Sequence, residues 1–157
     1  MSLLFQPTET QFERPRGVSN VEVRGGYAMV HVSDLDGDMG QARLHVLQVV
    51  ASGGISLDFL KLTPNGLSFL VSEERADAVG HALGAGNVPH EIRRPRSIVL
   101  VHAVNIRDEE GMIAGIVKTL IETGAQVDHL GDMHDRMLVV VPTEDAERVA
   151  ARFRETL

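Results

Sequence analysis

The sequence contains the stretch Tyr27-Ala-Met-Val-His-Val-Ser-Asp-Leu-Asp-Gly-Asp-Met-Gly40, which occurs again 71 residues later as Ile98-Val-Leu-Val-His-Ala-Val-Asn-Ile-Arg-Asp-Glu-Glu-Gly111. Two more pairs of blocks agree at an offset of 70 residues: Gly54-Ile-Ser-Leu-Asp-Phe-Leu60 with Gly124-Ala-Gln-Val-Asp-His-Leu130, and Val71-Ser-Glu-Glu-Arg-Ala-Asp-Ala-Val79 with Val141-Pro-Thr-Glu-Asp-Ala-Glu-Arg-Val149. Three blocks in one register, with one insertion near Gly53, indicate a duplication. The repeat predicts one structural unit built twice.

Composition limits the class of protein. The 157 residues are 43% hydrophobic and 24% charged, as in soluble globular proteins. Each unit of about 70 residues is near the lower limit for independent stability, so the units should share a sheet or pair with a second chain. No apolar run approaches a membrane span, and the start lacks a secretory signal, so we expect a cytoplasmic protein that does not enter membranes. The absence of cysteine excludes disulfides and thiolate catalysis.

Net charge argues against polyanionic partners. The formal charge of -7 repels phosphate backbones and anionic membrane surfaces, so no nucleic-acid partner is expected. One local basic cluster, Arg93-Arg94-Pro95-Arg96, is interpreted as a solvated connector between the repeats.

Hydrophobic periodicity predicts the same elements in both units. Strands are expected at 18–24, 28–32, 55–62, 67–71, 88–93, 98–104, 126–130 and 137–141, and helices have apolar stripes spanning 42–50, 76–83, 113–121 and 146–153. Asn65-Gly66 signals a hairpin, and Ser72 is a candidate helix cap. The fold class is therefore α+β, with two ferredoxin-like βαββαβ units in tandem, each an antiparallel four-stranded sheet with two helices on one face.

The domain boundaries follow from this order. Residues 1–16 have no period and are expected to form a flexible arm, 17–94 the first unit and 95–157 the second. The second unit lacks its final strand, because the chain ends after a helix. The strand at 18–24 either completes that sheet or caps the first unit through a hairpin at Gly25-Gly26.

Candidate chemistry lies where strands lead into helices. The sequence has no phosphate loop, nucleophile elbow or zinc helix. Gly40 and Gly111 mark two helix starts whose backbone N–H groups could hold an amino-acid carboxylate, with the ammonium group near Asp36, Asp38 or Asp108. The alternative is that the acidic residues there only stabilise the positive end of a helix dipole.

Histidines offer a weaker signal. His129, Asp132, His134 and Asp135 are close in sequence, but the first repeat has no matching ligands, so a solvated turn is preferred to a metal site. His31 and His102 share one repeat position, for which a packing or interface role is favoured over a pH switch because no partner is apparent. No metal or cofactor is expected.

Together, the repeat, the glycine turns and the strands beginning at Gly54 and Gly124 resemble the tandem ACT regulatory region of aspartate kinases over about 18–157. Asp108-Glu-Glu-Gly111 keeps the Asp and Gly of the family's Asp-x-Pro-Gly turn, whereas Gly37-Asp-Met-Gly40 keeps only the Gly. Ser56 and Gln126 replace the family's asparagine, while Asp58 and Asp128 remain. The resemblance implies that one unit is inserted within the other, so that the strand at 18–24 pairs in the second sheet.

The resemblance also implies a function. It predicts a non-catalytic, allosteric amino-acid-binding protein of amino-acid biosynthesis, without a kinase catalytic domain, that forms a homodimer and binds lysine or threonine at an interface between units. The residues it assigns to the ligand sites are Asp36, Asp38, Met39, Gly40, Gln41, Ala42, Ser56, Leu57, Asp58, Asn105, Asp108, Gly111, Met112, Ile113, Gln126, Val127 and Asp128. Two alternatives stay open: a structural dimerisation module whose ligand sites have decayed, and a regulatory subunit or fragment of an aspartate kinase that acts with a separate enzyme partner.

Overall fold

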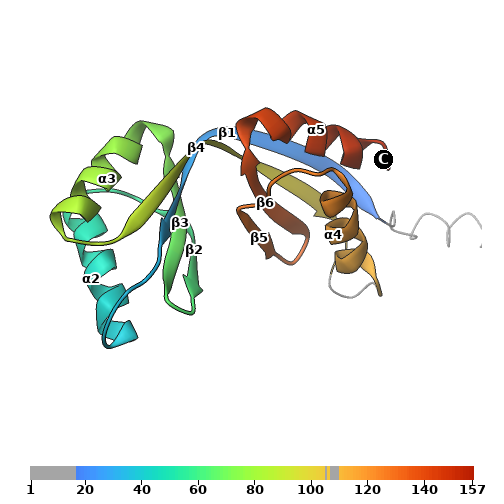
Figure 1. The fold of residues 1–157 in the computed structure, drawn as a ribbon. Coiled ribbons are helices and arrows are strands. Elements are labelled where there is room, and N and C mark those ends of the chain that lie inside the picture. The colour runs from blue at the N-terminus through green and yellow to red at the C-terminus, as the bar shows by residue number, and fades with distance from the viewer. Residues whose placement is uncertain (1–16, 105, 107–109) are drawn as a thin grey trace, which may run out of the picture. The chain divides into compact units, whose positions relative to one another are not determined.

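A computed structural model describes residues 17–104, 106 and 110–157 of the chain, which has a mixed α+β fold (Figure 1). The elements are β1 (Val18–Val32), α2 (Met39–Ser52), β2 (Asp58–Thr63), β3 (Gly66–Ser72), the short 3-10 helix η2 (Glu73–Arg75), α3 (Ala76–Ala85), β4 (His90–Ala103), α4 (Met112–Glu122), β5 (His129–Asp132), β6 (Arg136–Pro142) and α5 (Thr143–Arg154). The strands are hydrogen-bonded in the order β2-β3-β1-β4-β6-β5. No helix in the described part of the chain is long and apolar enough to cross a membrane.

The chain divides into two compact units. We call Arg24–Ile98 the inner unit, and residues 17–23 together with the described residues of 99–157 the outer unit. The long strands β1 and β4 each pass from one unit into the other. Each unit therefore contains four strand segments and two α-helices, and each has its own hydrophobic core.

The inner core lies between one sheet face and helices α2 and α3. Antiparallel pairing sets Ala28 opposite Val71, Val30 opposite Phe69 and Val32 opposite Leu67, so alternate residues of both strands face the helices. The helices bury the stripes that their 3.6-residue period predicts: Val46 and Val50 from α2, and Ala76, Val79 and Leu83 from α3. The predicted helices are confirmed here.

The outer core is built in the same way under α4 and α5. Strand residues such as Val99, Val101, Val139 and Val141 are buried against the two helices. The helical stripes are Ile116 and Leu120 from α4, and Ala146, Val149, Ala150 and Phe153 from α5. The periodic spacing of these apolar residues predicted both helices.

The N-terminal strand does not turn back as a hairpin at Gly25-Gly26. β1 continues through both glycines, although Gly26 has a φ of 85°. Its first residues belong to the outer unit, where Val21 is buried and the Ser19 hydroxyl donates to the carbonyl of His102 at 3.2 Å. A turn is unnecessary because the two halves of the strand bury their apolar residues in different cores. The hairpin alternative is therefore wrong.

The basic cluster lies in a strand and not in a loop, and its residues Arg94 and Pro95 are exposed as expected. Residues 93–96 lie inside the continuous strand β4, which contains a cis Arg94-Pro95 peptide. Arg94 pairs with Asp77 of α3 at 2.8 Å, and Arg93 pairs with Glu91 at 3.0 Å. Acidic neighbours supply partners for the charges, so the run of arginines does not need to leave the strand.

The turn between β2 and β3 differs from the sequence signal by one residue. Thr63 pairs with Gly66, so the two turn residues are Pro64 and Asn65, and Gly66 opens β3. A Cβ at Gly66 would lie 1.8 Å from the carbonyl oxygen of Val32. Glycine is required there for close approach of another backbone rather than for a positive φ.

Three other boundaries differ from expectation. β2 begins at Asp58 and β5 at His129, each three residues later than predicted, because the chain leaves the preceding helix through a left-handed glycine, Gly54 (φ 68°) or Gly124 (φ 74°), before it reaches the sheet. Ser72 precedes η2 rather than an α-helix, and its side chain makes no capping hydrogen bond.

Candidate functional site

The first predicted loop ends in a capped helix. Asp38 is the N-cap residue of α2, and its carboxylate accepts a hydrogen bond from the N–H of Gln41 at 2.9 Å. Gly40 lies in the first turn of the helix, where a Cβ would be 3.2 Å from the Asp38 carboxylate. The stabilising role expected for acidic residues at the helix start is thus seen for Asp38. The helix start already holds one negative charge from its own chain.

This loop is held against the β2–β3 turn. The Leu35 N–H donates to the carbonyl of Asn65 at 3.1 Å. Arg43 of α2 donates from Nε to the carbonyl of Gly66 at 3.0 Å and also bonds the carbonyl of Thr63. Asp36 and Asp38 remain exposed at the end of the loop. Backbone contacts around Gly66 therefore position the acidic loop of the inner unit.

The other predicted residues of the inner unit fall on two segments. Met39, Gly40, Gln41 and Ala42 form the first turn of α2. Ser56 is exposed and Leu57 packs on the inner core, both before β2, and Asp58 pairs with Leu70 at the start of that strand.

The second predicted loop has an uncapped helix. Gly111 is the N-cap residue of α4, in the left-handed region at φ 78°, and no side chain of the described residues makes a capping bond there. Met112 and Ile113 are the first helical residues. In repeat register, α4 begins two residues later than α2, so Gly40 and Gly111 do not occupy equivalent positions in their helices. Asn105 and Asp108 lie outside the described residues.

The third predicted group lies between α4 and β5. Gln126 donates from Nε2 to the Asp128 carboxylate at 3.2 Å, and the Asp128 N–H donates to the carbonyl of Val140 at 2.9 Å. Val127 is 37% exposed. The amide that stands at the family's asparagine position is therefore engaged by its own segment.

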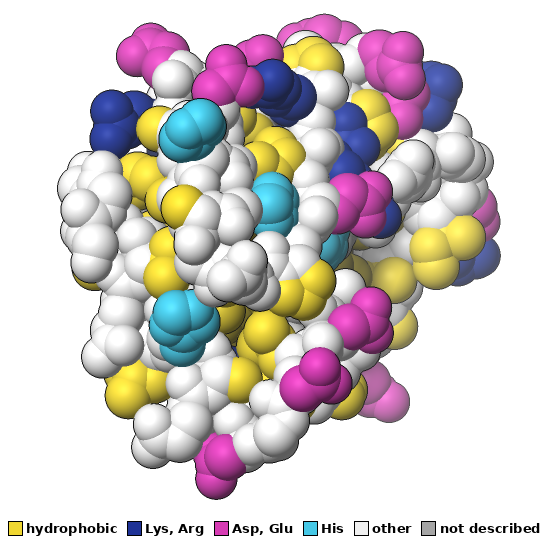
Figure 2. Space-filling model, turned by 60° about the vertical axis from the view of Figure 1, so that its left-hand side comes forward, with side chains coloured by type: hydrophobic (Ala, Val, Ile, Leu, Met, Phe, Trp, Pro, Cys, Tyr) yellow, Lys and Arg dark blue, Asp and Glu magenta, His cyan; other side chains and the backbone are white. Residues whose placement is uncertain are grey.

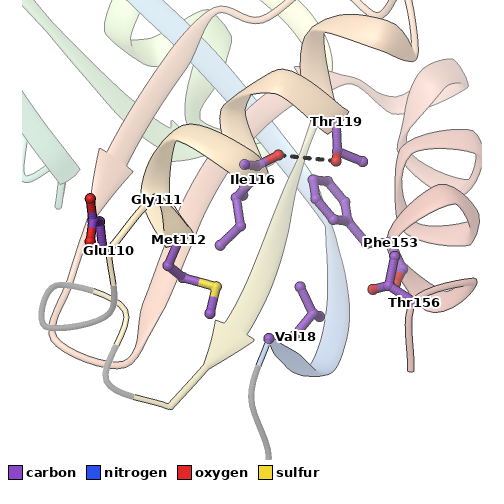
Figure 3. A pocket seen from close by; sticks show the side chains of 10 residues that line it. Val18, Glu110, Gly111, Met112, Ile116, Thr119, Phe153 and Thr156 are labelled. Atoms are coloured by element: carbon purple, nitrogen blue, oxygen red, sulfur yellow. Dashed lines mark hydrogen bonds between the residues drawn. The ribbon is translucent and has the colours of Figure 1, made fainter.

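A pocket of about 320 Å³ opens beside Gly111 in the outer unit. Its apolar lining comes from Val18 of β1, Met112 and Ile116 of α4, and Phe153 of α5, whose side chains point toward one another (Figure 3). Its polar lining is Glu110, Thr119 and Thr156, and the glycines are Gly17, Gly111 and Gly115. Two predicted site residues, Gly111 and Met112, are part of it.

Most of this lining was not identified from the sequence. Val18 lies far from Gly111 along the chain and meets it because the first residues of β1 belong to the outer unit, whereas Phe153 and Thr156 come from α5 and the turn after it, in the same unit. The sequence carried a signal for Val18. The predicted pairing of the strand at 18–24 in the second sheet places Val18 in the same unit as the helices of the second repeat.

The polar groups of the pocket are largely engaged. The Thr119 hydroxyl donates to the carbonyl of Gly115 at 3.0 Å (Figure 3), and the Thr156 hydroxyl donates to the carbonyl of Phe153 at 2.7 Å. Each hydroxyl retains acceptor capacity. Glu110 is exposed, and its side chain lies across the Gly111 turn from Met112 (Figure 3).

The histidines are spread over several elements of the described chain. His102 is half-buried, and its Nε2 lies 3.0 Å from a carboxylate oxygen of Glu22, a partner that the sequence did not indicate. Histidine side chains are scattered over the face shown in Figure 2. Within 17–104, 106 and 110–157, no group of three histidine or acidic residues could hold a metal ion.

Only the fold relates this chain to known proteins. No protein-family model matches the sequence, and no curated protein matches it significantly. Similar folds are found in the ligand-free regulatory subunit of aspartate kinase from Thermus thermophilus (20% identity, TM-score 0.79, 90% of this chain and 99% of that chain) and in the Thermus flavus regulatory subunit (20%, 0.73, 89% and 98%). Another is E. coli aspartokinase III in complex with lysine and aspartate (15%, 0.70), where the match covers 92% of this chain and 34% of that chain.

At these identities the comparison establishes the fold. The chain has the fold of aspartate kinase regulatory subunits, as its resemblance to their tandem repeats indicated.

Proposed function

We propose that this chain is a non-catalytic regulatory protein that binds an amino-acid effector and controls an enzyme partner of the aspartate kinase type. The observation that carries the proposal is the extent of the match: 90% of this chain aligns with 99% of a separate regulatory subunit. Residues 1–16, predicted to form a flexible arm, lie outside the described residues, and the predicted division into two units belongs to the same proposal. A cytoplasmic location fits this role.

The architecture of the units supports the proposal. The inner unit runs β1-α2-β2-β3-α3-β4, with strand order β2-β3-β1-β4, which fits a ferredoxin-like βαββαβ unit. The outer unit uses β4-α4-β5-β6-α5, and the first residues of β1 supply its remaining strand. We infer two tandem ACT-like units, the inner one inserted within the outer one.

Effector binding is assigned to the loops that begin α2 and α4. One of the similar structures is a complex with lysine and aspartate, so an amino acid of the lysine or threonine class is a reasonable first ligand to test. An effector that binds one arrangement of the protein more tightly than another shifts the population between them, and this difference is sufficient for regulation.

A homodimer is part of the proposal. On α4, Ile113, Val117 and Ile121 recur at four-residue spacing and form an apolar surface that includes Lys118 and Glu122. Ile121 is 69% exposed, which is unusual for a large aliphatic side chain beside such neighbours. Ile121→Glu should lower the sedimentation mass from dimer to monomer, whereas Leu157→Glu, also at an exposed residue, should not.

The alternative of a dimerisation module with decayed ligand sites is favoured by one observation. Gln126 stands where the family has asparagine, and an N–H of its amide donates to Asp128 at 3.2 Å, so that donor is used within its own segment. Calorimetric titration and thermal-shift measurement of the whole chain with lysine, threonine and the other amino acids decide between the two. Heat and a raised melting temperature support the regulatory proposal, whereas silence with every amino acid supports the module.

A second experiment tests the partner. Purified chain should co-purify with an aspartate kinase catalytic chain and should alter its activity in an effector-dependent way. Co-purification of the two chains without any effect on the activity of the catalytic chain would contradict a regulatory role.

A further inference from the structure

We propose that the pocket beside Gly111 binds a free α-amino acid with an aliphatic side chain, of the leucine or isoleucine kind, rather than lysine. This inference rests on the proposed amino-acid-binding function. It assigns the binding site to the outer unit and names the class of effector.

The lining selects an uncharged side chain. Ile116 and Phe153 are almost completely buried, and with Val18 and Met112 they make the interior of the pocket apolar. A lysine ammonium placed among them would lose its hydration. Among the described lining residues the one carboxylate is that of Glu110, which points away from these side chains (Figure 3). An aliphatic side chain would instead bury its surface against four hydrophobic residues.

The hydroxyls of the lining do not change the preference for an aliphatic side chain over lysine. Those of Thr119 and Thr156 donate to backbone carbonyls of their own helices or helix ends. They can therefore accept a hydrogen bond from a ligand ammonium but have no second proton to give. Thr119 is seven residues beyond Met112 in α4, about 10 Å at 1.5 Å per residue, which is too far for its hydroxyl to bond the α-ammonium group of a ligand whose carboxylate lies at the helix start. Neutral hydroxyl acceptors also compensate a lysine ammonium less than a carboxylate would.

The carboxylate end of the ligand has a place at the mouth. The pocket meets the first turn of α4 at Gly111 and Met112, where no described side chain provides a cap. N–H groups at a helix start favour a negative charge. In the inner unit, the carboxylate of Asp38 accepts from the Gln41 N–H and would repel a second carboxylate at the helix start. In the outer unit, the nearest described carboxylate, that of Glu110, is exposed and lies across the Gly111 turn from Met112 without capping the helix (Figure 3). The difference favours the outer unit as the site.

Size and shape agree with a small metabolite. At about 320 Å³, the pocket is at the lower end of the range for small-molecule sites, roughly 300–1,000 Å³. Gly115 lines it without a side chain, and a Cβ there would meet nothing within 4 Å. A larger residue at 115 should therefore enter the space meant for the ligand without disturbing the helix.

The test is calorimetry on the whole chain with leucine, isoleucine, lysine and threonine, using wild type, Gly115→Leu and Gly84→Leu. Gly84 is a matched control because it is also an exposed helical glycine with open space around its Cβ, but it lies in α3 of the inner unit. We expect leucine or isoleucine to bind at least about tenfold more tightly than lysine. Gly115→Leu should weaken that binding by about tenfold or more, and Gly84→Leu by less than about twofold. Circular dichroism of both variants should match wild type.

Other outcomes separate the two proposals. Tighter binding of lysine or threonine, or aliphatic binding that Gly115→Leu leaves unchanged, overturns this inference and leaves amino-acid regulation standing. No binding of any amino acid to the wild-type chain overturns both. Loss of binding in both variants alike also overturns the assignment to the pocket.

Discussion

Gly66→Ala should destabilise the inner unit severely. The new Cβ would lie 1.8 Å from the Val32 carbonyl oxygen and 2.7 Å from the Val32 carbonyl carbon, whereas ordinary contacts begin at 3.4 Å. Both neighbouring atoms belong to the backbone of β1, so no flexible side chain can move aside. The backbone must shift and strain the pairing of β1 with β3, and we expect a loss of about 3 kcal/mol in the free energy of unfolding.

Urea unfolding followed by circular dichroism measures this loss, and thermal unfolding should show a melting temperature lower by roughly 6–12 °C. Gly84→Ala is the control, because its Cβ meets nothing within 4 Å, and alanine should raise the stability of α3 by up to about 1 kcal/mol. Gly66→Ala should also disturb the acidic loop before α2, because Arg43 of α2 bonds the carbonyl of Gly66. A Gly66→Ala protein within about 0.5 kcal/mol of wild type would refute the close-approach explanation for this glycine.

Three further changes have defined outcomes. Asp38→Ala removes the acceptor for the Gln41 N–H and should cost about 1 kcal/mol in urea unfolding, whereas Asp38→Asn should keep most of it, and equal losses would argue against capping. Phe153→Ala should cost about 3–5 kcal/mol because this side chain is buried in the outer core, so a smaller loss in urea unfolding would indicate that the core collapses around it. The hydrogen bond from Arg136 lowers the pKa of Asp135, so the stabilisation by this pair is present above the ordinary carboxyl value of about 3.9 and is lost as pH falls through the lower folded-state value. Wild type and Asp135→Asn should therefore differ in unfolding free energy at neutral pH and converge in acid, and a difference that grows in acid would contradict this sign.

The repeat and the periodicities were sufficient to predict the mixed α+β class and the four α-helices of the described residues, because the apolar residues that each helix buries recur at helical spacing within a short stretch of sequence. Local turn signals were less reliable. Gly25-Gly26 and the arginine run near Pro95 both suggested breaks, but long strands continue through them. Whether the strand breaks at these positions depends on its pairing with segments that are distant in the sequence. The residues next to each position carry no information about that pairing.

The candidate site shows the same limit. The sequence identified Gly111 and Met112, which lie at the start of α4, where the repeat predicted a strand leading into a helix. It did not identify Val18, because its contribution depends on the first strand crossing into the outer unit, or Phe153, because its place on the apolar stripe of α5 indicated only a core residue. The repeat also suggested equivalent helix starts, whereas Asp38 caps one and Gly111 leaves the other without a side-chain cap.

A crystal structure of the whole chain grown with a mixture of amino acids is the most direct test of effector binding. We expect electron density for one amino acid in the outer unit, with its carboxylate at the first turn of α4 and its side chain among Val18, Ile116 and Phe153. Density for an amino acid at Asp38 instead, or no bound amino acid at either helix start, would contradict this assignment.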